Sequence, residues 1–331
     1  MKAENALELV LCADRRVLAG LHVTARSVVR HLDPKVERVR LTVYSESLLE
    51  EDRLLLESTL AATGRDCSLR VQSLETDVLK GFPKIRGSLG TYFRLLALAQ
   101  HDRPRFLYLD VDLLCLVDVW PMFQCDLGQY PAGFSTEAPI IGSADKGLIS
   151  ILGDEAIGDY LNAGVMVADV EACRQASVTE QCFSFLAEYP AEFHDQTALN
   201  YVLHRGYARL PSHYNCATNG RRWWPGFRSP ACGSGRILHY LDYPKPWSRL
   251  GRFLHPLAKP WWEEYRQTAH ALSGQALEEG VSYSIDERLL QGYKKVAKDK
   301  ILFSLYNRGW FHPKGVPMDE GKEGASVRRR T

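Results

Sequence analysis

This sequence of 331 residues lacks the features that mark membrane-spanning, secreted or nucleic-acid-binding proteins. None of its apolar runs approaches the roughly 20 residues that a membrane-spanning helix needs. The first 16 residues carry acidic side chains where a secretory signal has a basic region, and their apolar run is short. A formal net charge of +1 provides no overall attraction for nucleic acid. We therefore expect a cytoplasmic protein that does not bind nucleic acid.

Cysteine patterns typical of zinc sites are also missing. The eight cysteines form no C-x-x-C pair, and several lie inside apolar runs, where a free cysteine behaves as a small hydrophobic residue. We therefore expect structural thiols in a reducing compartment rather than zinc ligands or disulfides.

What the sequence does contain is an alternation of short apolar runs and segments with helical spacing. Strands are expected at residues 7–12, 39–44, 69–71 and 105–109, and helices at 19–32, 48–62 and 90–98. This alternation predicts an α/β fold with a mostly parallel sheet flanked by helices. Ligands of such sheets collect at the carboxyl ends of the strands, where Asp14, Asp110 and Asp112 fall. Residues 211–260 are rich in proline, glycine and aromatics, and we expect ordered loops there.

Asp110-Val111-Asp112 follows the apolar run 106–109. Two carboxylates at positions i and i+2 that leave a strand point to the same side. Buried together without a counter-ion they would repel each other, and a divalent cation that bridges to phosphates removes this conflict. The alternative is a solvated turn after an edge strand. Because the apolar run buries the strand, we favour the metal site.

His239 and Lys245 form a second candidate group. An imidazole after the apolar pair 237–238 can complete an oxygen-rich site for manganese, which accepts nitrogen ligands better than magnesium does. Lys245 lies between two prolines that restrict its backbone, and it offers a positive charge to a phosphate. A surface histidine and a solvated lysine are the alternative.

Two weaker groups contain amides and a carboxylate. Asp195 and Gln196, followed by Asn200, lie at or near the start of a helix, where they can bind sugar hydroxyls. The alternative for Asp195 is a helix cap. Asn162-Ala163-Gly164 precedes the apolar run 165–168, and a glycine there allows a close approach of backbone to a ligand.

These groups occur in a specific order within residues 7–247. The blocks are Ala13-Asp14, Thr91-Tyr92-Phe93-Arg94, Tyr108 to Asp112, Asn162 to Val165, Asp195-Gln196 with Asn200, and His239-Tyr240 with Lys245-Pro246-Trp247. Their order and spacing resemble the retaining glycosyltransferases of family 8. This family contains glycogenin and the bacterial lipopolysaccharide galactosyl- and glucosyltransferases, and the chain looks most similar to the bacterial lipooligosaccharide branch.

The resemblance implies the nucleotide-diphospho-sugar fold called GT-A, which has a mostly parallel Rossmann-like sheet flanked by helices, here with a small helical C-terminal extension. It implies a UDP-sugar donor, UDP-galactose or UDP-glucose, and Mn²⁺, with Mg²⁺ as the alternative cation. The implied acceptor is a glycan or glycolipid, such as lipopolysaccharide. The implied reaction is transfer of a hexose with retention of the anomeric configuration.

The resemblance also implies roles for residues by their position in the blocks. The metal ligands correspond to Asp110, Asp112 and His239. The residues that contact the donor correspond to Ala13, Asp14, Val111, Asn162, Ala163, Gly164 and Lys245. The residues that act on the donor sugar correspond to Arg94, Asp195 and Gln196.

Within this scheme Asp14 faces the uracil edge and Lys245 the diphosphate. Gln196 takes the place where a retaining nucleophile would be expected, but an amide is a poor nucleophile. The implied mechanism is therefore a same-face substitution, in which the leaving diphosphate helps to deprotonate the acceptor.

The chain departs from the family pattern at two places. Arg16 and Val17 replace an asparagine and an aromatic residue that contact the nucleoside in the lipooligosaccharide enzymes. Leu241-Asp242-Tyr243 replaces a loop that contains glycine, and an aspartate near a diphosphate is electrostatically unfavourable. These departures leave the nucleoside contacts and the donor sugar open.

We expect a catalytic domain at residues 1–270 and a C-terminal extension at 271–331. Residues 285–311 combine lysines and aromatics at roughly helical spacing, which suits peripheral contact with an anionic membrane on its inner face. The alternative is a helix that packs on the catalytic domain. From about residue 317 the polar composition indicates a disordered tail.

Two other functions remain open from the sequence. A phosphohydrolase of the haloacid-dehalogenase type also has Asp-x-Asp after a buried strand, but it needs Thr or Val shortly after the second aspartate, where this chain has Leu113-Leu114. A nucleotide-sugar or glycan-binding protein that has kept the fold without turnover is the second alternative.

Overall fold

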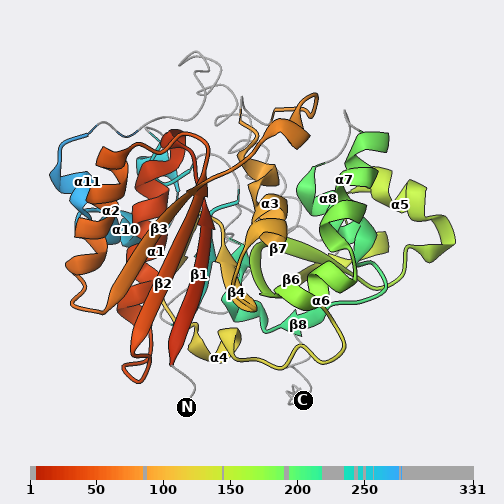
Figure 1. Ribbon diagram of the computed structural model, residues 1–331, viewed down its shortest axis with the longest axis horizontal. Helices are drawn as coiled ribbons and strands as arrows, with labels where there is room; N and C mark the ends of the chain where they lie inside the picture. The colour runs from red at the N-terminus through yellow and green to blue at the C-terminus, as the bar shows by residue number, and fades with distance from the viewer. Residues whose placement is uncertain are drawn as a thin grey trace, which may run out of the picture.

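The computed structural model describes residues 5–84, 88–143, 145–189, 194–217, 235–241, 245–248, 251–255, 257–275 and 277, and the statements below concern these residues. A seven-stranded sheet lies at the centre, with helices on both of its faces (Figure 1). Its strands, in spatial order, are β3 (Cys67–Ser73), β2 (Arg38–Ser45), β1 (Ala6–Cys12), β4 (Arg105–Leu109), β7 (Asp159–Asp169), β6 (Ala132–Pro139) and β8 (Ala208–Leu210).

The strand directions confirm the α/β fold with a mostly parallel sheet. β1 pairs in parallel with β2 and β4, β2 pairs in parallel with β3, and β8 pairs in parallel with β6. Only β7 departs from this direction within the described sheet, because it runs antiparallel to β4 and to β6. β3 is longer than the short strand that the sequence predicts at 69–71.

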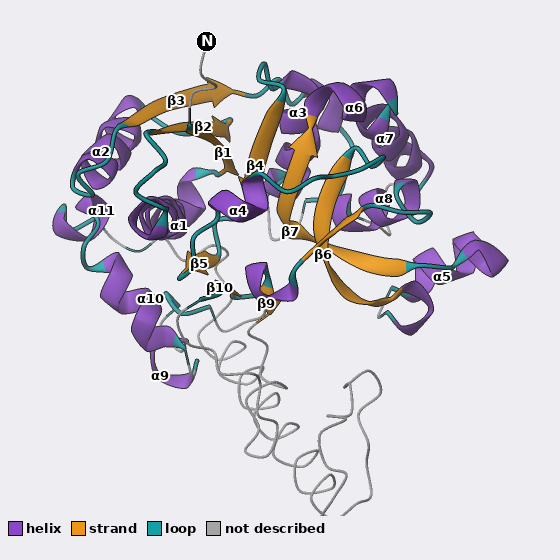
Figure 2. Cartoon of the chain, turned by 90° about the horizontal axis from the view of Figure 1, so that it is seen from below, coloured by secondary structure: helices purple, strands orange, loops and turns teal. Residues whose placement is uncertain are grey.

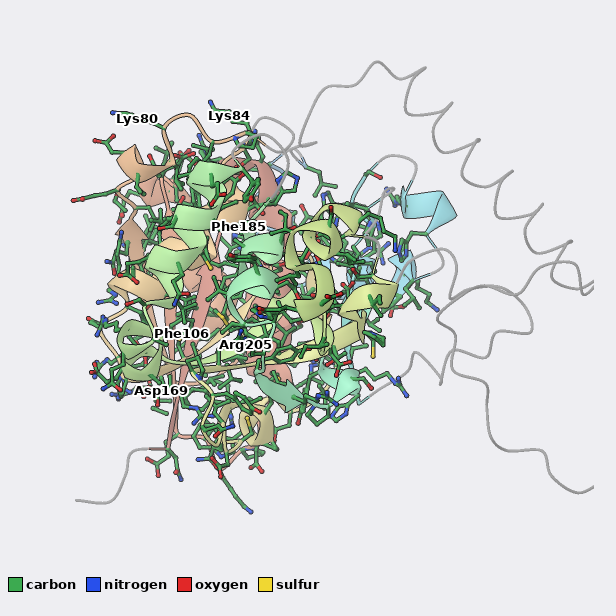
Figure 3. All side chains as sticks on the ribbon, turned by 90° about the vertical axis from the view of Figure 1, so that its right-hand side faces the viewer. Lys80, Lys84, Phe106, Asp169, Phe185 and Arg205 are labelled. Atoms are coloured by element: carbon green, nitrogen blue, oxygen red, sulfur yellow. The ribbon has the colours of Figure 1, made fainter. Side chains whose placement is uncertain are left out.

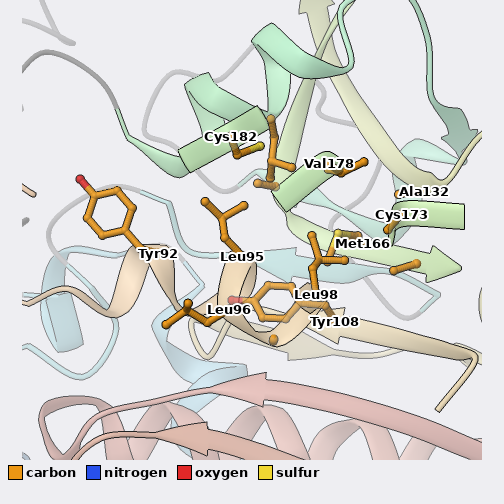
Figure 4. Close-up of a cluster of buried hydrophobic side chains, with 14 of the residues drawn as sticks. Tyr92, Leu95, Leu96, Leu98, Tyr108, Ala132, Met166, Cys173, Val178 and Cys182 are labelled. Carbon is orange, nitrogen blue, oxygen red and sulfur yellow. The ribbon is translucent and has the colours of Figure 1, made fainter. Parts of the chain in front are cut away.

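Successive residues of β1 face opposite helical layers, as the period of a strand requires. Leu9 and Leu11 pack with α1 (Leu18–His31) and α2 (Glu50–Ala61) on one face. Val10 belongs to the cluster on the other face, part of which Figure 4 shows. The helices of that face are α3 (Phe93–Gln100), α6 (Val170–Gln175), α7 (Val178–Glu188) and α8 (Asp195–Val202). Figure 2 shows the sheet from below, with the helices on both of its faces.

The edges of the molecule carry shorter elements. Helices α4 (Trp120–Phe123) and α5 (Lys146–Leu152) lie on the connections to and from β6. On the segment between β3 and α3, the exposed side chains of Lys80 and Lys84 extend from the edge of the body (Figure 3).

A second, three-stranded sheet contains β5 (Leu113–Cys115), β10 (Ile237–His239) and β9 (Cys216–Ala217). β10 runs antiparallel to β5, with His239 opposite Leu113, and pairs in parallel with β9. The expectation of loops at 211–260 is therefore wrong where the described part of that range forms these strands, and also at α9 (Gly251–Leu254) and at the start of α10 (Ala258–Tyr265). Strands of two or three residues are too short to show a period in the sequence.

The C-terminal helices of the described chain pack against α1 and α2. Glu264 of α10 is buried and accepts hydrogen bonds from Arg26 and, at 2.9 Å, from Arg30, both on α1. The backbone N–H of Ala269, which begins α11 (Ala269–Leu272), donates to Thr59 Oγ1 of α2 at 2.9 Å. The division expected after residue 270 falls within α11, and it stays a prediction.

Residues 285–311, where the sequence predicts membrane contact, and the tail from about 317 lie outside the described residues. Among the helices that are described, none combines the length and the apolar character that crossing a bilayer requires.

Candidate functional site

The loop between β4 and β5 carries Asp110 and Asp112, and the small sheet brings His239 to it. β10 pairs with β5 so that His239 lies opposite Leu113, the residue directly after Asp112. One ligand atom from each of these three side chains lies within 4.8 Å of the other two. The structure thus places together the predicted metal ligands, although one of them follows the other two by more than a hundred residues.

Asp110 uses one oxygen for the protein and turns the other toward the histidine. Its Oδ1 accepts a hydrogen bond from Tyr108 Oη at 2.7 Å and lies 3.0 Å from a guanidinium nitrogen of Arg94. Its Oδ2 lies 3.8 Å from His239 Nε2. A carboxylate fixed in this way presents a single oxygen to a cation.

His239 is 2% exposed, so the alternative of a surface histidine is wrong. Asn215 Oδ1 lies 2.8 Å from Nδ1 of the ring, and because an amide oxygen only accepts, Nδ1 carries the hydrogen. Nε2 then presents a lone pair toward Asp112 Oδ1, 3.1 Å away. This is the tautomer that a metal ligand needs. Asn215 has no local motif, so this contact was not predictable from the sequence.

The atoms that face one another here fit a divalent cation. Among the described residues, Oδ1 of Asp112 is a buried oxygen without a hydrogen-bond partner. It converges with Nε2 of His239 and Oδ2 of Asp110, which is the mixed oxygen and nitrogen donor set suited to Mn²⁺. A cation bound by these three atoms would satisfy the orphaned oxygen.

Lys245 contacts the other oxygen of Asp112. Its Nζ lies 2.6 Å from Asp112 Oδ2 and donates to the backbone carbonyls of Tyr240 and Leu241. The residue is 7% exposed, so the alternative of a solvated lysine is wrong. Burial raises the pKa of Asp112, but the positive charge of Lys245, together with the neighbouring His239, outweighs this effect and leaves the pKa well below its ordinary value.

Two glycines allow the backbone to approach this site. A Cβ added at Gly164 of β7 would lie 2.2 Å from Cε1 of His239 and 3.0 Å from Oδ2 of Asp110. A Cβ added at Gly20 of α1 would lie 2.2 Å from the carbonyl oxygen of Val111. Both positions therefore require glycine, and the first turn of α1 packs directly on the loop of the aspartates.

Arg94 connects the aspartate loop with the start of α8. Its Nε lies 2.6 Å from Oδ2 of Asp195, and one of its terminal nitrogens donates to the carbonyl of Ala163. Asp195 also accepts from the hydroxyl of Thr91, so this carboxylate binds two side chains of the α3 region rather than capping α8. Burial raises the pKa of Asp195, and Arg94 opposes that rise.

The predicted amides line the adjacent end of β7. Oε1 of Gln196 accepts from the backbone N–H of Ala163 at 3.0 Å, and Asn200 is buried with both of its amide groups bonded to Leu161. Oδ1 of Asn162 accepts from Gly164 N at 3.0 Å and from Asn215 Nδ2 at 2.7 Å. Nδ2 of Asn162 donates to Glu137, an exposed carboxylate on β6 that no sequence motif indicates.

The family follows from the sequence as a whole. The family model described as glycosyl transferase family 8 matches residues 8–251, well over half of the chain. This chain belongs to that family. The expected resemblance is therefore confirmed.

Relatives of this family 8 protein include curated bacterial proteins. General stress protein A of Bacillus subtilis is 26% identical over 274 residues, which cover 75% of this chain and 90% of that protein. Lipopolysaccharide 1,2-glucosyltransferase of Escherichia coli is 24% identical over 262 residues, which cover 75% of each. Among solved structures, the galactosyltransferase LgtC in complex with donor and acceptor sugar analogues gives a TM-score of 0.65 at 25% identity, covering 79% of this chain and 96% of that chain. The GT-A fold is thereby confirmed.

The first departure of this family 8 chain from the family pattern, at Arg16 and Val17, comes shortly after the end of β1. Ala13 N donates to the carbonyl of Tyr44 at 3.1 Å, which extends the pairing of β1 with β2 by one residue. Asp14, directly after it, is largely buried, and its carboxylate accepts hydrogen bonds from Arg16 and from Ser88. Asp242, the other departure, lies outside the described residues.

Proposed function

We propose that this family 8 protein transfers a hexose, galactose or glucose, from a UDP-sugar to a saccharide acceptor, with retention of configuration and dependence on Mn²⁺. The observation that carries the proposal is the convergence of Asp110 Oδ2, Asp112 Oδ1 and His239 Nε2 around an orphaned buried oxygen. The names of two relatives support the class of sugar, because one is a galactosyltransferase and the other a glucosyltransferase.

In this proposal Asp110, Asp112 and His239 would hold Mn²⁺, with Mg²⁺ as the alternative, and the cation would supply positive charge against the diphosphate. Asp110 is oriented by Tyr108 and Arg94, and His239 by Asn215. Lys245, which lies against Asp112, is within reach of the same charges and would stabilise the leaving diphosphate.

The donor sugar would lie between the aspartate loop and the start of α8. Arg94, Asp195 and Asn162 present charged and amide groups on that side, and Gln196 lies beside the backbone of Ala163. Because the amide of Gln196 is a poor nucleophile, we propose same-face substitution. The proton of the acceptor hydroxyl passes to the departing diphosphate, and Arg94 with its partners orients the sugar.

The proposed acceptor is a glycan or glycolipid, lipopolysaccharide or another cell-surface glycan, and the proposed location is the cytoplasm. The name of the Escherichia coli relative supports the acceptor class. Seven described cysteines are free thiols, which suits a reducing compartment. Membrane contact through residues 285–311 is proposed from the basic and aromatic sequence alone.

Release of UDP from UDP-galactose and UDP-glucose tests the proposal, with and without Mn²⁺. We expect turnover that requires Mn²⁺ and is lost in Asp110→Ala, since that change removes a metal ligand and leaves Arg94 without one of its carboxylates. Asp66→Ala is the matched control, because Asp66 is an exposed carboxylate that pairs with Arg38. Metal-independent transfer would overturn the proposal. Binding of UDP-sugars without turnover on any acceptor would favour a nucleotide-sugar-binding protein instead.

A further inference from the structure

The carboxylate of Asp145 connects three elements on the side of the molecule where α8 begins. Its Oδ1 accepts from the backbone N–H of Leu148 at 3.1 Å and so caps the start of α5. Its Oδ2 accepts from the phenol of Tyr160 on β7 at 3.1 Å and from the hydroxyl of Thr197 on α8 at 2.7 Å. One half-buried aspartate therefore holds α5, β7 and α8 together.

Tyr160 links Asp145 to the amide of Gln196. The single hydroxyl hydrogen of Tyr160 goes to Asp145, so toward Gln196 the phenol oxygen can only accept. It lies 3.5 Å from Nε2 of Gln196, a long hydrogen bond, while Oε1 of the same amide accepts from the backbone N–H of Ala163 at 3.0 Å. The two ends of the Gln196 amide are thus distinguished, and both are held by β7.

The two hydroxyls that donate to Asp145 are shielded from solvent. Tyr160 is 6% exposed and Thr197 is 7% exposed. Burial raises the pKa of Tyr160, the hydrogen bond from Gln196 opposes the rise, and the charge of Asp145 adds to it. The phenol therefore keeps its hydrogen at neutral pH and remains a donor to the carboxylate. Hydrogen bonds to an ionised carboxylate are stronger than those between neutral groups.

We propose that Asp145 is a positioning residue for the transfer reaction. It holds the amide of Gln196 through Tyr160 and the first turn of α8 through Thr197. This inference rests on the proposed function, in which Gln196 lies on the side of the donor sugar. Displacing a group beside the reacting atoms by about 1 Å can slow a reaction about 100-fold, so a residue that touches no substrate can limit kcat.

The experiment measures kcat for UDP release and the affinity for UDP, both with Mn²⁺ and with the better of UDP-galactose and UDP-glucose as donor. Asp145→Ala removes the carboxylate. Tyr160→Phe removes the link to Gln196 and leaves the cap of α5 in place. Asp169→Ala is the control for the cap, because Asp169 is also half-buried and caps α6 by accepting from Ala172 N at 2.9 Å.

A second control concerns the phenol. Tyr207 is 7% exposed, and its hydroxyl lies 2.9 Å from Oγ1 of Thr136 instead of bonding Asp145. Tyr207→Phe therefore removes a buried phenol oxygen without touching the link to Gln196.

Asp145→Ala and Tyr160→Phe are each expected to lower kcat about tenfold, the size of effect that the loss of one hydrogen bond predicts. Both are expected to bind UDP like the wild type, because the amide of Gln196 lies on the side of the sugar and not of the diphosphate. Asp169→Ala and Tyr207→Phe are expected to keep the wild-type kcat.

The side-chain amide signals of Gln196 provide a readout that needs no turnover. In protein labelled with ¹⁵N-glutamine, these signals are identified by their absence in Gln196→Ala. They are expected to shift in Asp145→Ala and in Tyr160→Phe, and to stay in place in Asp169→Ala and Tyr207→Phe.

The inference is overturned if either Asp145→Ala or Tyr160→Phe keeps the wild-type kcat, or if the Gln196 signals stay in place in either variant. It is also overturned if Asp169→Ala lowers kcat as much as Asp145→Ala, since the loss of a helix cap would then account for the effect. All these results leave the proposed function intact, because the wild type still transfers the sugar. If the wild type releases no UDP from either donor with Mn²⁺, the proposed function fails and the inference fails with it.

Discussion

Two buried histidines, His239 beside the aspartate loop and His22 on α1, have different surroundings although both are shielded from solvent. His239 faces two carboxylates through Nε2 and bonds an amide oxygen through Nδ1. His22 bonds the hydroxyl of Thr59 through Nδ1 at 2.7 Å, and its ring lies 5.3 Å from that of His270.

The group of side chains around each histidine, the first cluster around His239 and the second around His22, contains a buried polar atom that has no hydrogen-bond partner among the described residues. In the first cluster this atom is Oδ1 of Asp112, and in the second it is Nε2 of His22 itself. Within the part of the chain that the structure describes, only Oδ1 of Asp112 converges with other metal-ligand atoms. The hydroxyl of Thr59 also accepts from Ala269 N, so the second cluster attaches α11 to α2. An orphaned atom therefore indicates a cation site only where atoms of suitable chemistry surround it.

Removing the two imidazoles separately is the strongest test of this difference. His239→Ala is expected to abolish measurable Mn²⁺ binding, because the variant has lost one of three ligands. His22→Ala is expected to bind Mn²⁺ like the wild type and to unfold at a lower temperature, since it leaves a cavity and removes the bond to Thr59. Calorimetric titration with Mn²⁺ and thermal unfolding give the two readouts. Equal loss of Mn²⁺ binding in both variants would contradict the assignment of His239.

A smaller effect is expected at Asn215, which fixes the tautomer of His239. Asn215→Ala is expected to weaken Mn²⁺ binding about 10- to 100-fold, the usual range for a residue that orients a metal ligand. His213→Ala is the control, because His213 lies two residues earlier and its ring packs on Tyr214. Unchanged Mn²⁺ affinity in Asn215→Ala would show that the histidine orients without this bond.

An effect of comparable size, on stability and not on metal binding, is the pH dependence that His22 causes. Burial, followed by the nearby His270, lowers the pKa of His22 from 6.5 to about 3. The pKa of His270 is also lowered, by burial, against the opposing charge of Asp52. As the pH falls from 6.5 toward 3, the unfolded chain takes up a proton at His22 that the folded chain does not. The lowered pKa of His270 acts in the same direction. Stability is therefore lost in that window.

For His22 alone this linkage amounts to about 2 kcal/mol of unfolding free energy at pH 5. Urea unfolding at pH 7.5 and pH 5 measures it. His22→Gln, which cannot titrate, is expected to lose less stability between the two pH values than the wild type. A loss of the same size in wild type and variant would assign the pH dependence to other groups.

Much of the fold was predictable because its signals are local. β1 and β4 are largely apolar runs whose side chains are mostly buried on both faces, and α1 has helical spacing, so each element is identified by residues within a few positions of one another. The strands β5, β9 and β10 were not predicted, since two or three residues carry no period. They are defined by backbone pairing between segments that lie far apart in the chain.

The same division applies to the candidate site. The sequence by itself determined that Asp110 and Asp112 leave a buried strand on one side, and the order of the blocks determined the family. Only the tertiary structure decided that Asn215 orients His239, that Lys245 lies on Asp112 across 133 positions, and that Arg16 covers Asp14. Burial and periodicity depend on neighbouring residues, whereas these contacts depend on how separate strands pair and which side-chain atoms then come within hydrogen-bond distance.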